Sequence, residues 1–232
     1  MVKKKIVVLS GAGISAESGI STFRDSNGLW ENYRIEEVAT PEAWSANPEL
    51  VQQFYNQRRK QVMESLPNAA HAFFRELESH YDVIVVTQNI DDLHERAGSS
   101  KVIHLHGNIR YSKSSGPKQE AKYYPIEGWE LSMNDLCEDG YPLRPHVVWF
   151  GESVPEMERA VETLADANYL IVIGTSLNVY PAAGLIHYVS NSCKKLIVDP
   201  KVSELSIDSG FVTFSKSAVE SVPDLRKFFE IN

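Results

Sequence analysis

The chain repeats one pattern along most of its length: short runs rich in valine and isoleucine alternate with longer amphipathic stretches. Apolar runs of this length are typical of buried parallel strands, and stretches with helical periodicity are typical of the helices that cover them. The expected strands are 5–10, 82–87, 101–106, 146–150, 169–174, 195–199 and 211–214. The expected helices are 48–66, 68–80, 155–167, 181–192 and 222–230. This alternation predicts an α/β fold, a Rossmann-like doubly wound parallel sheet.

Two regions interrupt the alternation. The segment 26–66 indicates helix without an intervening strand, and the segment 107–144 is polar and aromatic with several glycines. We expect the two to form one smaller inserted domain. The expected boundaries are 1–30, 67–106 and 145–232 for the Rossmann-like domain, and 31–66 and 107–144 for the small domain.

Composition excludes several classes of protein. With 232 residues, 43% of them hydrophobic, the chain is long enough to bury a full core. Only Cys137 and Cys193 are present, which excludes a disulfide framework and a four-cysteine zinc site. We find no export signal and no apolar run long enough for a membrane span, so we expect a cytoplasmic protein. The net charge of -8 argues against nucleic-acid binding, and we expect a monomer.

The first expected strand leads directly into a glycine-rich turn. Gly11-Ala12-Gly13-Ile14-Ser15-Ala16 follows residues 5–10 and matches the phosphate-binding turn G-x-G-x-x-G/A. The alternative is a tight strand-to-helix turn with no ligand. A dehydrogenase would next show a second strand ending in an acidic residue, and that strand is missing. A polar and aromatic loop over residues 18–30 follows instead, either a cover for a bound cofactor or an ordinary surface loop.

Polar residues also follow two later strands. Gln88-Asn89-Ile90-Asp91 comes after strand 82–87, and His104-Leu105-His106-Gly107 ends strand 101–106. Open α/β sheets bind ligands at this edge, where amides and carboxylates can hold ribose hydroxyls. His106 could act there as a general base near neutral pH. Alternatively, His104 and His106 share one strand face and only pack or bind a metal.

Taken together, these motifs and two further ones resemble the sirtuin family, in the same order and at the same spacing, from about residue 5 to about residue 225. The matching segments are Gly11-Ala12-Gly13-Ile14-Ser15, Gly19-Ile20, Phe23-Arg24, Thr87-Gln88-Asn89-Ile90-Asp91, Leu105-His106-Gly107, Arg144-Pro145-His146-Val147-Val148-Trp149-Phe150-Gly151-Glu152 and Gly174-Thr175-Ser176-Leu177. The resemblance is to the bacterial type and implies an NAD-dependent protein-lysine deacylase. It further implies acyl-lysine proteins as substrates, and nicotinamide and O-acyl-ADP-ribose as products.

The resemblance also implies a role for each matching residue. His106 would be the catalytic base, with Asn89 as a second catalytic residue. The implied NAD-binding residues are Gly11, Ala12, Gly13 and Ser15 at the pyrophosphate; Phe23 and Arg24 near the nicotinamide; Gln88, Asn89 and Asp91 at its ribose and carboxamide; and Gly174, Thr175, Ser176, Asp199 and Ala218 at the adenosine. Asp199 departs from the asparagine common in the family. Val147, Trp149, Phe150 and Gly151 would pair with the substrate backbone.

The helix expected over 48–66 bears on the choice of acyl group. Tyr55 and Arg58 are three residues apart and therefore share one face. A guanidinium beside a phenol suits a carboxylate, and the pair is similar to the motif by which some sirtuins accept succinyl- and malonyl-lysine. The alternative is that Arg58, Arg59 and Lys60 form a solvated basic face.

The sequence departs from the family at its zinc site. Most sirtuins bind zinc through two Cys-x-x-Cys pairs, whereas Ser112 and Ser114–Ser115 stand near the first pair here and Cys137 alone remains near the second. We expect no zinc and a small apolar core in its place. The residues expected in that core are Tyr123, Tyr124, Ile126, Trp129, Leu131, Leu136 and Tyr141.

Two other functions use the same cofactor. One is a non-catalytic NAD or ADP-ribose sensor, and the other is a protein ADP-ribosyltransferase. A binder does not need a base at the ribose, so the presence of His106 and Asn89 favours deacylation.

Overall fold

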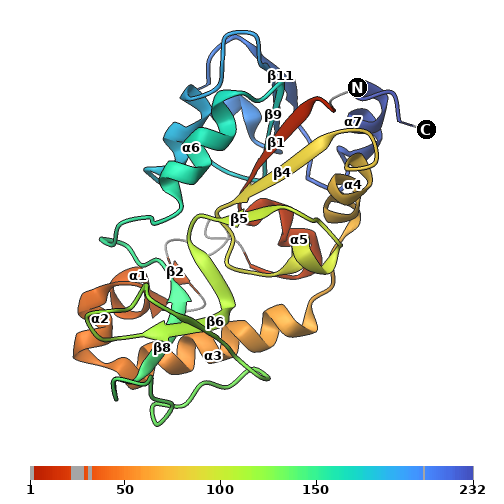
Figure 1. Ribbon diagram of the computed structural model, residues 1–232. Helices are drawn as coiled ribbons and strands as arrows, with labels where there is room; N and C mark the ends of the chain where they lie inside the picture. Colours follow the sequence, from red (N-terminus) through yellow and green to blue (C-terminus); the bar gives the residue numbers. More distant parts are fainter. Residues whose placement is uncertain (1–2, 22–28, 31–32, 206, 232) are drawn as a thin grey trace.

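A six-stranded parallel sheet forms the centre of the larger domain (Figure 1). The computed structural model describes residues 3–21, 29–30, 33–205 and 207–231. The strand order is β11-β10-β9-β1-β4-β5, with β1 Lys5–Ser10, β4 Asp82–Thr87, β5 Val102–His104, β9 Tyr169–Ile173, β10 Lys194–Val198 and β11 Phe211–Phe214. The prediction of a Rossmann-like doubly wound parallel sheet is confirmed.

Both faces of this sheet are covered. Helices α4 (Ala69–Leu77) and α7 (Val222–Phe228) pack on one face with Ile6 and Val8 of β1. Helix α6 (Met157–Ala165) and the 3-10 helix η3 (Ala182–His187) pack on the other with Val7 and Leu9. Alternate residues of β1 thus enter two separate cores, which explains why its run is apolar without interruption.

The smaller domain lies below the large sheet in Figure 1. Its helical part contains α1 (Ile35–Val38), α2 (Pro41–Ala46) and the long α3 (Pro48–Glu64). A three-stranded antiparallel sheet packs beside them in the order β7-β6-β8. These strands are β6 Gly107–Ser114, β7 Tyr123–Pro125 and β8 Leu143–Val147. The remaining short elements are β2 Leu29–Trp30, β3 Tyr33–Arg34, α5 Leu93–Arg96 and η4 Val202–Glu204.

Several elements differ from the sequence prediction. The strand expected over 146–150 ends at Val147 and belongs to the antiparallel sheet. Just beyond Val147 the N–H of Val148 still donates to the His106 carbonyl at 2.9 Å, but the N–H of Trp149 donates instead to the Glu152 carboxylate at 2.8 Å, and the strand does not continue. The hairpin of β2 and β3 interrupts the segment expected to be helical throughout. The helix expected over 181–192 is a single 3-10 segment, and Gly184 in its middle disfavours an α-helix.

The small core expected in place of zinc is only partly as predicted. Ile126 and Leu131 are buried with Tyr124 packed against them, but the other two buried members are Cys137 and Leu143. Tyr123, Trp129, Leu136 and Tyr141 are exposed, which makes them wrong as core residues. The Ser114 hydroxyl lies 3.3 Å from the Cys137 sulfur. Across the described residues, no group of three or more His, Cys, Asp and Glu side chains could hold a metal ion.

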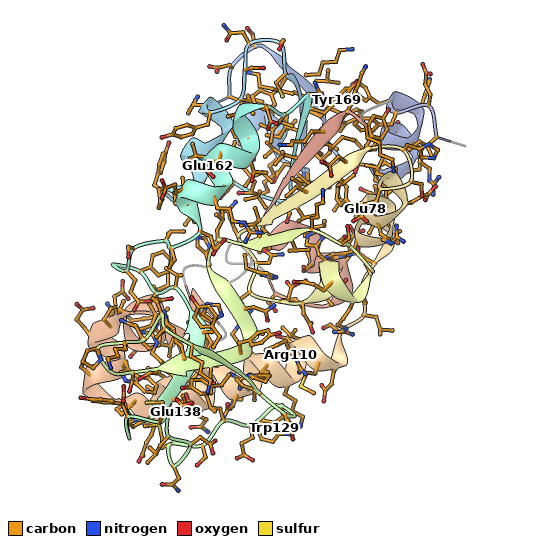
Figure 2. The ribbon with its side chains drawn as sticks, viewed as in Figure 1. Glu78, Arg110, Trp129, Glu138, Glu162 and Tyr169 are labelled. Carbon is orange, nitrogen blue, oxygen red and sulfur yellow. The ribbon has the colours of Figure 1, made fainter. Side chains whose placement is uncertain are left out.

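A buried arginine joins α3 to this region. Arg59 has no exposed surface; its Nε donates to the Ile109 carbonyl at 2.6 Å, and its Nη1 donates to the Trp129 carbonyl at 2.8 Å. Figure 2 shows Trp129 and Arg110 beside α3, far from Tyr169 and Glu78 at the other end of the molecule. Burial, together with the nearby charge of Arg110, lowers the pKa of Arg59 to about 10. The side chain thus stays charged at neutral pH and bridges three segments of the small domain.

None of the helices in the described ranges is long and apolar enough to cross a membrane.

Replacement of this arginine tests the bridge. We expect Arg59→Met to lower the free energy of unfolding by ~3 kcal/mol, because two buried carbonyl groups lose their charged donor. Chemical denaturation measures the loss. Lys60→Met is the matched control, since Lys60 is exposed, and it should change the free energy by less than ~0.5 kcal/mol. Equal effects of the two substitutions would contradict the bridging role.

Candidate functional site

Two glycine loops touch backbone to backbone at the carboxyl edge of the large sheet. The N–H of Gly11 donates to the Ile173 carbonyl at 3.0 Å, and the N–H of Gly13 donates to the Gly174 carbonyl at 2.8 Å. A Cβ atom on Gly13 would lie 2.7 Å from the Gly174 Cα, and Gly174 itself has a φ of +63°. Glycine at these three positions is therefore required by the contact between the loops.

The turn does not continue into an α-helix as the motif predicts. Two 3-10 segments follow instead, η1 (Ala12–Ile14) and η2 (Ala16–Ser18). The side chain of Asn68, which caps α4, donates to the Ile14 carbonyl at 2.8 Å and to the Ser18 hydroxyl at 3.0 Å. The helix that supports the turn is thus α4, which begins some fifty residues later in the chain.

The turn is linked to the end of β4 by side-chain hydrogen bonds. The Ser15 hydroxyl donates to the Asp91 carboxylate at 3.0 Å and accepts from the Asn89 amide at 3.1 Å. The second oxygen of Asp91 accepts from the backbone N–H of Leu93 at 3.1 Å. All three side chains are buried. Burial raises the pKa of Asp91, although the hydrogen bonds from Leu93 and Ser15 oppose this. Asp91 thus positions Ser15 and, through it, Asn89.

The neighbouring residue Gln88 connects β4 to the second glycine loop and to His106. Its amide donates to the Thr175 hydroxyl at 3.0 Å, and the same hydroxyl accepts from the N–H of Leu177 at 3.2 Å. Its carbonyl lies 2.9 Å from Nδ1 of His106. The structure therefore brings Ser15, Gln88, Asn89, Thr175 and His106 to one edge of the sheet.

The contact with Gln88 determines the state of His106. A carbonyl oxygen can only accept, so Nδ1 carries the proton and Nε2 is left as the basic nitrogen of a neutral ring. Burial lowers the pKa of His106, and the hydrogen bond to Gln88 only partly opposes this. The imidazole is thus prepared to accept a proton at neutral pH.

His104 is held in a different state. Its Nδ1 lies 3.0 Å from the Asn89 carbonyl and its Nε2 lies 2.6 Å from the Glu95 carboxylate, so both nitrogens donate. Burial alone would lower the pKa of His104, but the hydrogen bond and charge of Glu95 raise it. Because β5 ends at His104, the two histidines do not share a strand face as expected. His104 is a structural cation beside the edge.

A buried histidine pair beneath this edge has no counterpart in the sequence prediction. His94 lies 3.0 Å from the Ser10 hydroxyl, which donates in turn to the Thr87 hydroxyl at 2.9 Å. The His71 ring packs edge-on against His94 with centroids 4.9 Å apart. Ser10 and Thr87 end β1 and β4, so this chain of contacts fixes the spacing of the two loops that follow. His71 is the third residue of α4 and His94 the second residue of α5, and no sequence pattern indicates that they meet.

The remaining predicted NAD-binding residues lie along the same edge or outside the described residues. Gly174, Thr175 and Ser176 follow β9, and Asp199 follows β10. The Asp199 side chain is buried and accepts from the N–H of Lys201 at 2.8 Å. Ala218 is buried in the core cluster that contains residues of α4 and α7. Phe23 and Arg24 lie outside the described residues.

The predicted substrate residues meet at the boundary between the two domains. Tyr55 and Arg58 are 0% and 4% exposed. The indole N–H of Trp149 donates to the Tyr55 hydroxyl at 3.2 Å, and Val147 and Trp149 share the core of α3. Phe150 is exposed, and Gly151 has a φ of +92°. Burial raises the pKa of Tyr55, although the hydrogen bond from Trp149 and the positive charge of Arg58 act in the opposite direction.

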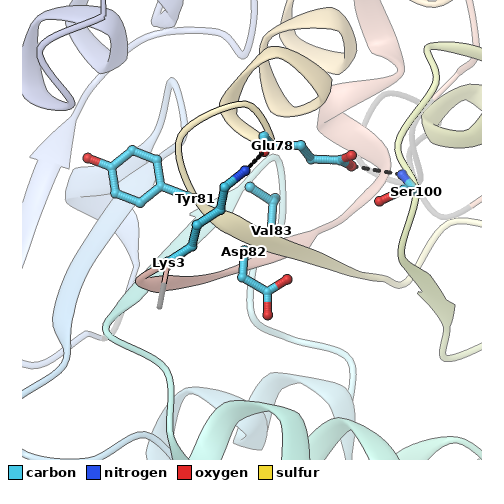
Figure 3. A pocket seen from close by; sticks show the side chains of 6 residues that line it. All are labelled: Lys3, Glu78, Tyr81, Asp82, Val83 and Ser100. Carbon is cyan, nitrogen blue, oxygen red and sulfur yellow. Dashed lines mark hydrogen bonds between the residues drawn. The ribbon is translucent and has the colours of Figure 1, made fainter. Parts of the chain in front are cut away.

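A separate hollow lies at the opposite edge of the sheet, lined by Lys3, Glu78, Tyr81, Asp82, Val83 and Ser100 (Figure 3). Its polar groups bind one another: Lys3 donates to the Glu78 carbonyl at 2.7 Å, and the N–H of Ser100 donates to the Glu78 carboxylate at 2.7 Å. Nothing in this hollow resembles the arrangement at the carboxyl edge.

Known proteins are similar to this chain in sequence and in fold. The model of the Sir2 family matches residues 11–181. An NAD-dependent protein deacylase of Bacteroides thetaiotaomicron is 49% identical over 227 residues, which is 97% of each chain. A protein of the same name from Helicobacter pylori is 48% identical over 224 residues, or 96% of each chain. A crystal structure of a Sir2 homologue with NAD superposes with a TM-score of 0.87 at 38% identity, covering 98% of this chain and 90% of the other.

The buried pair predicts a pH dependence of stability. Burial lowers the pKa of His71 to about 4, so the folded protein holds this ring neutral while the unfolded chain protonates near pH 6.5. Its contribution is complete above pH 6.5 and is lost as the pH falls towards 4, by ~3 kcal/mol in total. Urea unfolding at a series of pH values measures this slope. His71→Leu should flatten it, and replacement of the exposed His80 by Gln should not; a slope that His71→Leu leaves unchanged would rule out this origin.

Proposed function

Because this chain belongs to the Sir2 family and is an NAD-dependent protein deacylase, we propose that it removes succinyl and malonyl groups from protein lysines as well as acetyl groups. Acylated proteins of the cytoplasm would be its substrates, and it would act as a monomer. The acyl preference is carried by one observation: a tyrosine and an arginine are buried together beside the strand end where the substrate would lie.

The pair suits a short acidic acyl group. Arg58 is 4% exposed, so the alternative of a solvated basic face holds only for Lys60. A guanidinium in such an environment binds a carboxylate through charge-assisted hydrogen bonds, and these are strong where water is excluded. The phenol of Tyr55 stays protonated at neutral pH because burial raises its pKa, so it can donate to the same carboxylate. An acetyl group carries no charge and would make no such bond to Arg58.

The edge described above fits NAD. Open α/β sheets bind dinucleotides where the strand order reverses, and here β1 lies between β4 and β9. NAD, when bound, supplies the ADP-ribosyl group that receives the acyl group as nicotinamide is released. Gly11, Ala12, Gly13 and Ser15 would hold its pyrophosphate, and Gln88 and Asn89 its nicotinamide end. Gly174, Thr175, Ser176, Asp199 and Ala218 would hold the adenosine.

His106 would act as the general base of the reaction. Its neutral ring, with Nδ1 fixed by the Gln88 carbonyl, can take a proton from a ribose hydroxyl at Nε2. Asn89 would act with it, held in place by Ser15 and indirectly by Asp91. The backbone of His106 also accepts from the N–H of Val148 at 2.9 Å, so the proposed base and the proposed substrate strand are joined directly.

The last residue of β8 and the residues that follow it would bind the substrate backbone. Val147, Trp149, Phe150 and Gly151 lie in the connection from the small domain to α6, and the N–H of Phe150 donates to the Ala39 carbonyl at 3.0 Å. Recognition through an extended backbone would allow many target sequences. A sensor of NAD or an ADP-ribosyltransferase is less well supported, because neither explains why the His106 ring is fixed by the Gln88 carbonyl with Nε2 left free to accept a proton.

Substitution of Arg58 tests the acyl preference. The purified protein is incubated with NAD and matched acetyl-lysine and succinyl-lysine peptides, and the loss of each acyl group is followed by mass spectrometry. We expect Arg58→Met to reduce kcat/KM for the succinyl peptide by ~100-fold, the effect of losing a charge-assisted contact, and to change deacetylation by less than ~5-fold. Lys60→Met, two residues away and exposed, is the control. Equal losses on both peptides, or transfer of ADP-ribose to protein, would contradict the proposal.

The pH profile tests the base. Because burial lowers the pKa of His106, the unprotonated ring should persist below pH 6.5. We expect kcat/KM, which reports the ionisation of the free enzyme, to fall on the acid side with a midpoint below 6.5, and His106→Ala to lose ~10²- to 10⁴-fold in kcat. Steady-state rates over a pH series supply both values. An acid limb that is unchanged in His106→Ala would assign the proton transfer to another group.

A further inference from the structure

Arg144 is enclosed by the loop that follows it. Its Nη1 and Nη2 donate to the two oxygens of Glu152 at 2.7 and 2.9 Å, and Nη2 also donates to the Val147 carbonyl at 2.8 Å. Its guanidinium carbon lies 3.4 Å from the centre of the Trp149 ring. One side chain thus contacts the beginning, middle and end of the segment 147–152.

Glu152 closes the same loop from the other side. Its Oε2 accepts from the backbone N–H of Trp149 at 2.8 Å, and its own N–H donates to the Trp149 carbonyl at 3.0 Å. The side chains of Arg144 and Glu152 are 5% and 16% exposed. Burial acts to raise the pKa of Glu152, but the bond and charge of Arg144 lower it, so the carboxylate remains ionised. The pair is fully charged, and its bidentate geometry fixes the plane of both groups.

The indole of Trp149 links Arg144 to Tyr55 of the proposed acyl pocket. Its ring is stacked on Arg144, and its N–H donates to the Tyr55 hydroxyl at 3.2 Å. Displacement of the Arg144 guanidinium would therefore move the indole and change the position of the phenol.

We propose that Arg144 and Glu152 are positioning residues for substrate binding: their ion pair holds the loop 147–152 and, through Trp149, places Tyr55 in the acyl pocket. This inference rests on the proposed function of that pocket and adds two residues to it that do not touch the substrate. Lysine cannot replace Arg144, because it lacks both the planar stacking surface and the two-pronged donor.

The test compares Arg144→Lys and Glu152→Gln with the wild type, by steady-state kinetics on succinyl and acetyl peptides. We expect each substitution to raise KM for the succinyl peptide about tenfold, as for one lost charge-assisted bond, and to raise KM for the acetyl peptide less. KM for NAD and kcat should stay within about twofold, because the NAD edge is held by other contacts. Glu152→Gln keeps the size of the side chain and one acceptor oxygen. If Arg144→Lys does not fold, the kinetics of Glu152→Gln test the positioning role.

The matched control is Arg226→Lys. Arg226 binds Glu76 through both nitrogens on the far side of the large domain, with Nη1 2.8 Å from Oε1. Arg226→Lys should lose less stability than Arg144→Lys, because the side chains of Arg226 and Glu76 are 34% and 37% exposed, and it should change no KM. A purely structural role for Arg144 predicts this same result for Arg144→Lys, and unchanged peptide KM values in both variants would overturn the proposal. A rise in the KM for NAD as large as the rise in the KM for the peptide would also overturn the proposal.

The two proposals can fail separately. If the wild type does not remove succinyl groups, the acidic acyl preference is wrong, and the KM for the acetyl peptide alone tests the positioning of the loop. If Arg58→Met abolishes desuccinylation while Arg144→Lys and Glu152→Gln leave every peptide KM unchanged, the pocket stands and the positioning role is wrong.

Discussion

The backbone contact between the two glycine loops is the constraint on which the arrangement of this site depends. Gly11 and Gly13 lie so close to Gly174 that no side chain fits at any of the three. The contact joins the end of β1 to the end of β9, and Ser10 with Thr87 joins β1 to β4. Three neighbouring strands are therefore held in one register at the edge where they present their polar groups. The glycines serve the protein's own packing at least as much as the approach of a ligand.

Charge at this site is controlled by which atom each polar group faces. His104 and His106 are two residues apart and contact successive carbonyls, yet one faces a carboxylate and the other does not. Their pKa values consequently move in opposite directions. At the end of the segment 147–152, Glu152 neutralises Arg144 directly. A single contact to each histidine thus gives His104 and His106 different pKa values and different roles.

Much of this molecule could be predicted from its sequence, and the failures have physical reasons. The runs that form β1, β4 and β9 are buried on both faces, so their apolar pattern is unambiguous. The run at 146–150 looks equally apolar, but the Glu152 carboxylate, which lies outside it, accepts from the N–H of Trp149 just beyond the last strand residue, Val147. Exposure of Trp129 and Tyr141 could not be read from their type, because aromatic residues occupy surfaces as well as cores. Arg59 bonds to residues that are at least fifty positions away in the sequence, and Arg144 bonds to a residue eight positions away across a turn. Local sequence patterns do not indicate such contacts.

Helix α3 has one further consequence. Tyr55 and Arg58 lie on it, and on the same helix Gln52, Asn56 and Arg59 bind the segment 129–131: the amides of Gln52 and Asn56 both donate to the Leu131 carbonyl at 3.0 Å. The helix thus carries the proposed acyl-binding pair and is also the attachment point of the segment 129–131. Substitutions in the segment 129–131 would change the tilt of α3 and would displace Tyr55 and Arg58 together. Related enzymes could in this way diverge in the acyl groups they accept while every residue that contacts the substrate stays the same.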